Sequence, residues 1–146
     1  MLADLTKHHL LGKVLAYMYT IEFQKRGLPH AHLLLFLHPS SKYPTPEDID
    51  NIICAEIPPK NEQNELYQQV QAHMIHGPRG IANRSSLCMK DGKCSRFYPK
   101  KFQTCTVVDS DGYPIYRHRD TGNTILKGGV ILDNRSVVPY NPNTST

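Results

Sequence analysis

Two apolar segments on either side of a short turn-forming stretch constrain the fold of this 146-residue chain more than any other feature. Val14 to Phe23 is rich in β-branched and aromatic residues, and His30 to Leu37 is again apolar. Between them, Arg26-Gly27-Leu28-Pro29 supplies the glycine and proline of a turn. Because such residues favour strands that flank a turn, the pattern predicts an antiparallel hairpin.

Side chains alternate between the two faces of a strand, so His30 and His32 are expected on one face of the second strand. Glu22 and Gln24 alternate onto the matching face of the first strand. Two imidazoles with one oxygen ligand can hold a divalent metal that stays open on one side and polarises a phosphodiester. We therefore predict a metal site from His30, His32 and either Glu22 or Gln24. Without further context, two solvent-facing histidines with no metal are the simpler interpretation.

Two helices are expected after the hairpin. Thr45-Pro-Glu-Asp48 combines an N-cap threonine, a proline at the first helical position and an acid three residues after the cap, so a helix should run to about Cys54. Leu66, Val70 and Met74 recur at helical spacing and predict a second helix with an apolar stripe for core packing.

The second half is expected to be rich in loops. Beyond Phe102, short β-prone pieces alternate with glycine-containing turns and predict small hairpins. Pro139 to Thr146 is interpreted as a loose tail without core-forming residues. With 11 prolines and 9 glycines, the fold class is predicted as α+β, an antiparallel β-sheet with flanking helices followed by a loop-rich β-hairpin half. The length favours one domain.

The whole chain has a formal net charge of +4, and its basic residues gather in the second half. They surround Phe97, Tyr98 and Phe102, and cations mixed with aromatic rings suit single-stranded DNA. The alternative is a solvated basic loop. The candidate DNA-binding residues here are Lys93, Arg96, Lys100 and Lys101.

Zinc-capable ligand types occur in the same region, as His73, His76, Cys88 and Cys94. Their spacing, His-x-x-His and Cys-x5-Cys, is loose for zinc. Buried free cysteines with a helix-end histidine are the equal alternative.

No apolar run approaches the roughly 18 residues that cross a membrane, and no signal peptide precedes the four cysteines. We therefore expect a reduced intracellular protein without a membrane partner. No small-molecule substrate is evident.

The eleven residues from Glu22 to His32 resemble the signature of Helitron-like Rep domains, which belong to the HUH endonuclease group. Further segments resemble family segments in family order: 11–14, 55–58, 73–78, 88–94, 98–100, 111–117 and 133–142. The resemblance implies an antiparallel sheet with flanking helices, a divalent metal such as Mg or Mn at the histidines, DNA contact that includes Lys25 and Arg26, and a nuclear location. The chain is thus interpreted as one partial Rep domain, with sheet, helices and histidine motif in 1–76 and the Cys/basic loop and hairpins in 77–146.

In similar proteins, a tyrosine pair in a Lys-Tyr-rich helix beyond the segment 133–142 becomes joined to nicked single-stranded DNA during rolling-circle transposition. These 146 residues contain neither that helix nor a phosphate loop of a helicase. Tyr113 and Tyr116 lie in a β-prone segment that resembles a different part of the family, so a structural role is favoured. No catalytic residue is assigned, and we expect no nicking by these residues alone.

Arg79 stands where family relatives commonly have a cysteine after His-Gly-Pro, which weakens the zinc hypothesis. Two alternatives to a nicking-domain fragment follow. One is a degenerate, non-catalytic transposon remnant or nucleic-acid-binding module, and the other is a small zinc-stabilised interaction module.

Overall fold

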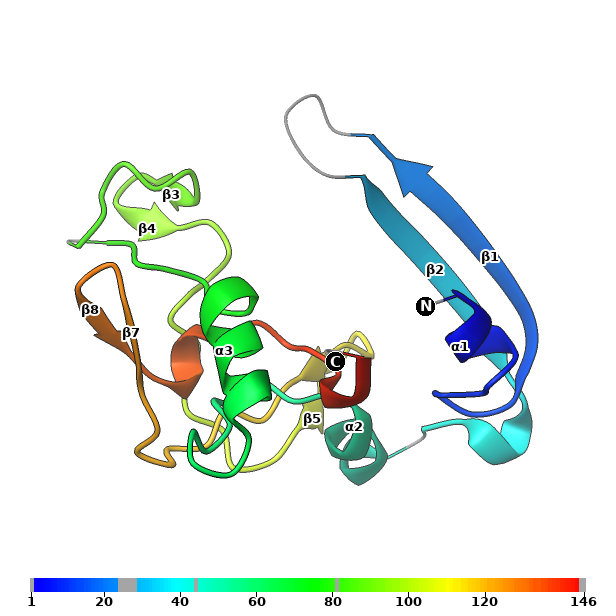
Figure 1. Ribbon diagram of the computed structural model, residues 1–146. Coiled ribbons are helices and arrows are strands. Elements are labelled where there is room, and N and C mark those ends of the chain that lie inside the picture. The colour runs from blue at the N-terminus through cyan, green and yellow to red at the C-terminus, as the bar shows by residue number, and fades with distance from the viewer. Residues whose placement is uncertain (1, 24–28, 44, 81, 145–146) are drawn as a thin grey trace. The chain divides into compact units, whose positions relative to one another are not determined.

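The computed structural model describes residues 2–23, 29–43, 45–80 and 82–144 and belongs to the α+β class, with short antiparallel sheets and a few helices (Figure 1). Contacts between residues divide the chain into two compact units, 1–44 and 45–146. The division of one partial domain at residue 76 stays a prediction. No helix in the described ranges is both long and apolar enough to cross a membrane.

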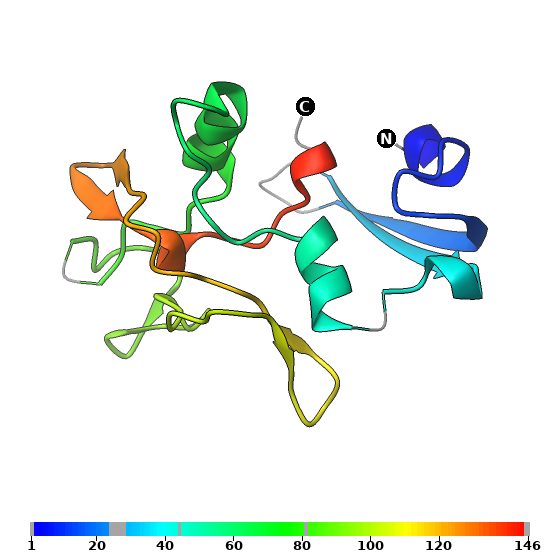
Figure 2. The same ribbon diagram turned by 90° about the horizontal axis from the view of Figure 1, so that it is seen from below.

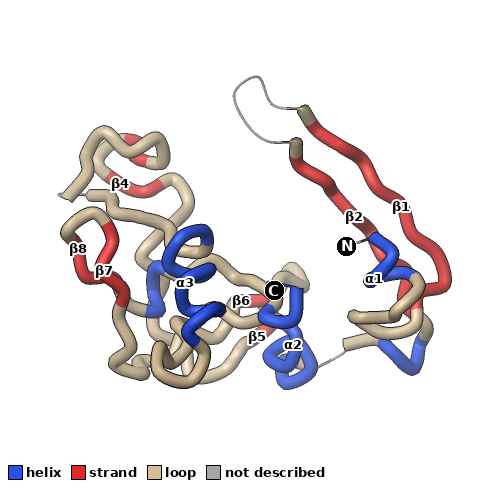
Figure 3. Tube along the Cα trace, viewed as in Figure 1, coloured by secondary structure: helices blue, strands red, loops and turns tan. Residues whose placement is uncertain are grey.

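The first unit is built on the predicted hairpin. A short helix α1 (Leu2–Thr6) precedes β1 (Val14–Glu22), which pairs antiparallel with β2 (His30–Leu37), as the two long strands of Figure 3 show. From His32 onward exposed residues alternate with the half-buried Leu33, Leu35 and Leu37, which confirms the expected alternation of faces there, whereas His30 and Ala31 are both exposed. The predicted turn residues 26–28 lie outside the described residues.

Hydrogen bonds close the base of this hairpin. After β2, the 3-10 helix η1 (Pro39–Ser41) turns the chain back, and Lys13 N–H donates to Ser41 Oγ at 3.1 Å. Tyr43 Oη donates to the Leu11 carbonyl at 2.9 Å. Gly12 has φ +95°, and a Cβ there would lie 2.6 Å from Ser41 Cβ, so both its backbone conformation and the close approach require glycine.

The second unit contains both predicted helices. α2 (Pro46–Ile52) begins at a capping box in which Thr45 Oγ1 accepts from Asp48 N–H and the Asp48 carboxylate accepts from Thr45 N–H. α3 (Asn64–His73) places the predicted stripe on the core, with Val70 fully buried and Leu66 and Met74 packed against the cluster. That cluster consists of Ile57, Val70, Ile75, Ile125, Val137 and Tyr140.

Three short hairpins separated by loops follow α3, as predicted, and the β5–β6 hairpin projects from the unit in Figure 2. Each hairpin pairs antiparallel strands that follow one another in sequence. The strands are β3 (Met89–Lys90) with β4 (Lys93–Cys94), β5 (Val107–Val108) with β6 (Pro114–Ile115), and β7 (Ile125–Lys127) with β8 (Val130–Leu132).

The interpretation of residues from Pro139 onward as a loose tail is wrong for Tyr140. After the 3-10 helix η2 (Asn134–Ser136), Tyr140 pairs with Cys54, is 5% exposed and donates its hydroxyl to the Glu56 carbonyl at 3.0 Å. One large aromatic ring gains enough by burial to fix a segment that is otherwise rich in Pro and Asn. A last 3-10 helix, η3 (Pro142–Thr144), follows, and residues 145–146 lie outside the described residues.

Glu56 is a buried carboxylate at the centre of this unit, 7% exposed. Arg119 binds it with two side-chain hydrogen bonds of 2.8 and 2.7 Å and one backbone bond of 3.0 Å, and Arg117 Nε lies 3.5 Å away. Burial acts to raise the pKa of Glu56, but the hydrogen bonds and charge of Arg119, with the charge of Arg117, outweigh it and hold the pKa below its usual 4.5.

Replacing Glu56→Gln is expected to lower the free energy of unfolding by about 2 kcal/mol, because the arginines lose their buried counter-charge. Since the folded pKa is lowered, the stabilisation is complete above 4.5 and disappears as the pH falls through the folded value. Urea unfolding at neutral and acidic pH measures both effects. Exposed Glu62→Gln is the matched control, and an equal acid sensitivity of wild type and Glu56→Gln would contradict the prediction.

Candidate metal centres

The β1–β2 hairpin places the predicted histidine motif on one face. Glu22 lies directly opposite His30 and Thr20 opposite His32, so the side chains of Glu22, His30 and His32 share that face. His32 Nε2 is 3.3 Å from Glu22 Oε2, and these side chains are 70% and 59% exposed. His30 is exposed as well. A third candidate ligand, Gln24, lies outside the described residues.

The three ligands on this face are not assembled into a metal site: Glu22 and His32 are in contact, and His30 lies on the same face without contacting them. Only Glu22 and His32 are in contact, and no group of three ligand atoms forms on the described part of the hairpin. An imidazole and a carboxylate in contact are a donor set that divalent metals accept, and the exposure leaves room for water and substrate oxygens.

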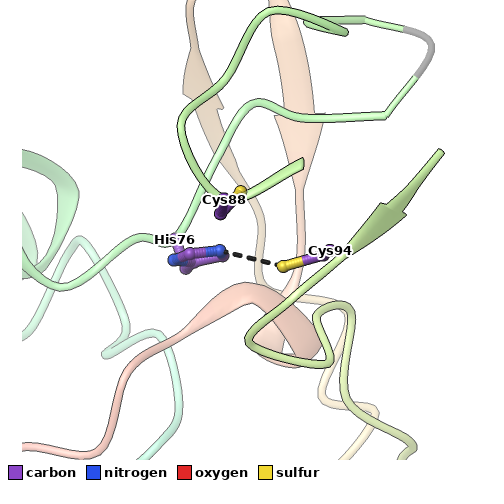
Figure 4. Close-up of side chains that lie close together, drawn as sticks. All are labelled: His76, Cys88 and Cys94. Atoms are coloured by element: carbon purple, nitrogen blue, oxygen red, sulfur yellow. Dashed lines mark hydrogen bonds between the residues drawn. The ribbon is translucent and has the colours of Figure 1, made fainter. Parts of the chain in front are cut away.

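The second centre is a cluster of His76, Cys88 and Cys94 in the second unit (Figure 4). One ligand atom of each lies within 4.8 Å of the other two, and His76 Nε2 is 3.3 Å from Cys94 Sγ. Among the described residues, this is the one group of three or more His, Cys, Asp or Glu side chains whose ligand atoms lie close enough together to hold a metal ion.

Local backbone geometry brings the cluster together. Asp91 with φ 49° and Gly92 with φ 76° form a tight turn between β3 and β4, so Met89 pairs with Cys94 and Cys88 comes close to it. His76 follows α3, and its N–H donates to the Ser136 carbonyl at 2.8 Å, which fixes it opposite the two cysteines.

Charges around the cluster favour metal-binding protonation states. Burial lowers the pKa of His76, and the nearby Arg79, Arg96 and Lys100 lower it further. Burial acts to raise the pKa of Cys94, but backbone hydrogen bonds at Tyr98 and Arg96 and the charge of Arg79 contribute to a net decrease. A neutral imidazole and a thiolate are the forms that bind a metal.

Tyr98 packs against the cluster. Its ring stacks on His76 with centroids 4.3 Å apart, and two cations lie over it, Lys100 at 4.8 Å and Arg79 at 5.2 Å. Arg79 also donates from Nη1 to the His76 carbonyl and, at 3.5 Å, from Nη2 to Ser136 Oγ. Arg79 is thus bound beside the cluster.

His73 does not join the cluster that the sequence indicated. It is the last residue of α3 and is exposed. Because the helix ends there and Ile75 then pairs with Val137, His73 and His76 do not share a helical turn. The structure therefore brings together three members of the predicted set of four.

Among the predicted DNA-binding residues that the structure describes, Arg96 and Lys100 lie close enough to His76 to lower its pKa, and Lys93 precedes Cys94 in the chain. Lys93 belongs to β4, and Lys93, Arg96 and Lys101 are exposed while Lys100 is half-buried. Lys25 and Arg26 lie outside the described residues.

Sequence reasoning gave no site role to Arg135, whose guanidinium lies 4.7 Å from the Phe102 ring centroid. A contact between residues so far apart in the chain has no periodic signal in the sequence. The only signal in the sequence for such a contact was the abundance of basic residues in the part of the chain that contains Phe102.

Tyr113 lies in the turn between β5 and β6, and Tyr116 directly follows β6. Tyr113 is 70% exposed, and its N–H donates to Asp109 Oδ1 in the turn. Tyr116 is half-buried, and burial raises its pKa, which makes the phenol a weaker source of phenolate.

Comparison with protein families gives a match over residues 1–35 to a family described as the Helitron helicase-like domain at the N-terminus. The matched segment contains β1 and the first part of β2, and so it includes Glu22, His30 and His32. The first unit is therefore similar to Helitron-related proteins. A comparison with curated proteins gives no match.

Replacing Tyr98→Leu is expected to lower the free energy of unfolding by about 1 kcal/mol, because the ring's stacking on His76 and its contacts with two cations are lost. Thermal or urea denaturation measures the change. Tyr113→Leu, at an exposed ring, is the control, and a Tyr98 variant as stable as this control would refute the prediction.

Proposed function

We propose that the chain is part of a Helitron-type transposition protein whose β1–β2 hairpin holds a divalent metal, Mg or Mn, against single-stranded DNA. The observation that carries the proposal is the contact between Glu22 and His32 within the segment that matches the family. In the bound state, His30 and His32 would provide nitrogen ligands and Glu22 an oxygen ligand. The proposal implies that the protein acts on nuclear DNA.

The metal would supply Lewis acidity to a phosphodiester oxygen. The exposed face lets a DNA strand approach without rearrangement of the hairpin, since the His32 and Glu22 side chains are more than half exposed. Nicking also requires a nucleophile, which the family resemblance places in a tyrosine helix after the segment 133–142. The proposal for these residues is therefore metal and DNA binding, and no catalytic residue is assigned.

Replacing His32→Ala is expected to weaken manganese binding by about tenfold or more, because a direct ligand is lost. Titration calorimetry or manganese electron paramagnetic resonance measures the affinity. His8→Ala removes another exposed histidine of the same unit and should leave binding unchanged. Equal affinity of the His32 variant and wild type would rule out the hairpin as the metal site.

A degenerate remnant that only binds nucleic acid is the alternative, and it differs from the proposal in lacking the metal. Incubating the protein with single-stranded DNA and manganese or magnesium is expected to give neither a covalent protein–DNA adduct nor a shortened strand, because no nucleophile is assigned to these residues. DNA binding without measurable manganese affinity supports the alternative.

We also propose that His76, Cys88 and Cys94 hold zinc as a structural centre. The donor types fit zinc, and ligand atoms of a tetrahedral zinc site lie about 3.5 Å apart, close to the 3.3 Å between His76 Nε2 and Cys94 Sγ. Bound there, the ion would connect the segment after α3 to the β3–β4 hairpin. Three protein ligands leave a fourth position for water or another donor.

Purified protein is expected to contain about one zinc per chain, and Cys88→Ser or Cys94→Ser should remove most of it, since a lost thiolate weakens the site. Elemental analysis and the thermal midpoint with and without a chelator measure the effect. Cys105→Ser changes an exposed cysteine outside the cluster and serves as control. Metal-free wild type with an unchanged midpoint would exclude a structural zinc.

A further inference from the structure

A pocket of about 580 Å³ lies beside the β3–β4 hairpin in the second unit. Phe97 and Lys93 form one wall, and Ile131 and Leu132 of β8 form another. This volume lies within the usual range for small-ligand sites. The pocket therefore has both apolar and charged lining residues.

Phe97 is an unusual residue at the pocket wall. The residue is 80% exposed, and its backbone has φ 57°, a left-handed conformation that bulky residues rarely adopt. The Phe97 N–H donates to the Cys94 carbonyl at 3.0 Å, which fixes this conformation while the adjacent Tyr98 packs inward on His76. Backbone strain of this kind occurs often at ligand-binding positions. The backbone of Phe97 is therefore fixed, and its aromatic ring is exposed to solvent.

The charge around the pocket is positive. The lining includes three basic residues, Arg79, Lys93 and Arg135, and one acidic residue, Asp133. Arg135 binds Asp133 through several hydrogen bonds, the shortest 2.6 Å, and these hold the pKa of Asp133 low. Asp133 is thus compensated, and two further cations, Arg79 and Lys93, remain among the lining residues. An apolar surface next to excess positive charge fits a ligand with a flat ring and a phosphate.

We infer that this pocket binds one unstacked base of single-stranded DNA, with the base ring on Phe97 and an adjoining phosphate beside Lys93. The inference rests on the proposed DNA partner and assigns it a site distinct from the hairpin. Stacking tolerates any base, so the pocket would add affinity without sequence preference. A base inside a duplex is already stacked and would not enter.

The test uses the full chain and a labelled oligothymidylate in buffer without added manganese or magnesium, with the dissociation constant measured by fluorescence anisotropy. Phe97→Ala is expected to weaken binding about tenfold, and Phe97→Trp to restore it, since stacking on one aromatic ring is removed and then replaced. Tyr113→Ala, at an exposed ring outside the pocket, should bind like wild type. Lys93→Ala should reduce the slope of log affinity against log salt by about 1.

A strand carrying 2-aminopurine adds a readout that a merely structural change would not produce, because its fluorescence changes when the base leaves its neighbouring bases. A fluorescence change with wild type and its loss in Phe97→Ala supports the pocket. Wild-type affinity and the same fluorescence change in Phe97→Ala overturns it while leaving the hairpin metal site untouched. Absence of any binding by wild type overturns both the pocket and the DNA partner, whereas an unaltered His32→Ala manganese affinity overturns only the metal proposal.

Discussion

The buried carboxylate of Glu56 is the constraint on which the second unit depends. The unit has short hairpins and one small apolar cluster, so its long segments need side-chain bonds to keep them together. Arg119, 63 positions away in sequence, closes one long loop on Glu56, and the Tyr140 hydroxyl closes another on the Glu56 carbonyl. Because a buried charge is costly unless it is fully paired, these contacts select one arrangement of the chain.

Asn134 extends this network to the site. Its Oδ1 accepts from Ile57 N–H at 2.7 Å, and its Nδ2 donates to the Arg119 carbonyl at 2.6 Å. Asn134 begins η2, and the neighbouring residues Asp133, Arg135 and Ser136 line the pocket beside Phe97. The Ser136 carbonyl also accepts from His76 N–H. One short helical turn therefore connects the core to both the cluster of His76, Cys88 and Cys94 and the pocket.

Local patterns were readable from the sequence, and contacts between distant segments were not. The capping box at Thr45 and the stripe through Val70 depend on neighbours within a few residues, and β1 and β2 follow one another in sequence; the structure confirms all three. Tyr140 was misjudged because its burial depends on Cys54 and Glu56, far away in the chain. In the candidate sites, residue types indicated His76 and both cysteines, but only the end of α3 decides that His73 lies elsewhere. The metal and DNA assignments stay predictions.

The hairpin of the first unit has one further physical consequence. Its sheet has just two strands, so each strand keeps one hydrogen-bonding edge without a sheet neighbour among the described residues. Met18 is 64% exposed and Leu15 60%, so apolar side chains accompany these edges. Two-stranded ribbons are marginal by themselves, and open apolar edges recruit strands from other molecules. In concentrated solution, we therefore expect molecules to self-associate through the β1–β2 hairpin rather than through the second unit, which has a buried core.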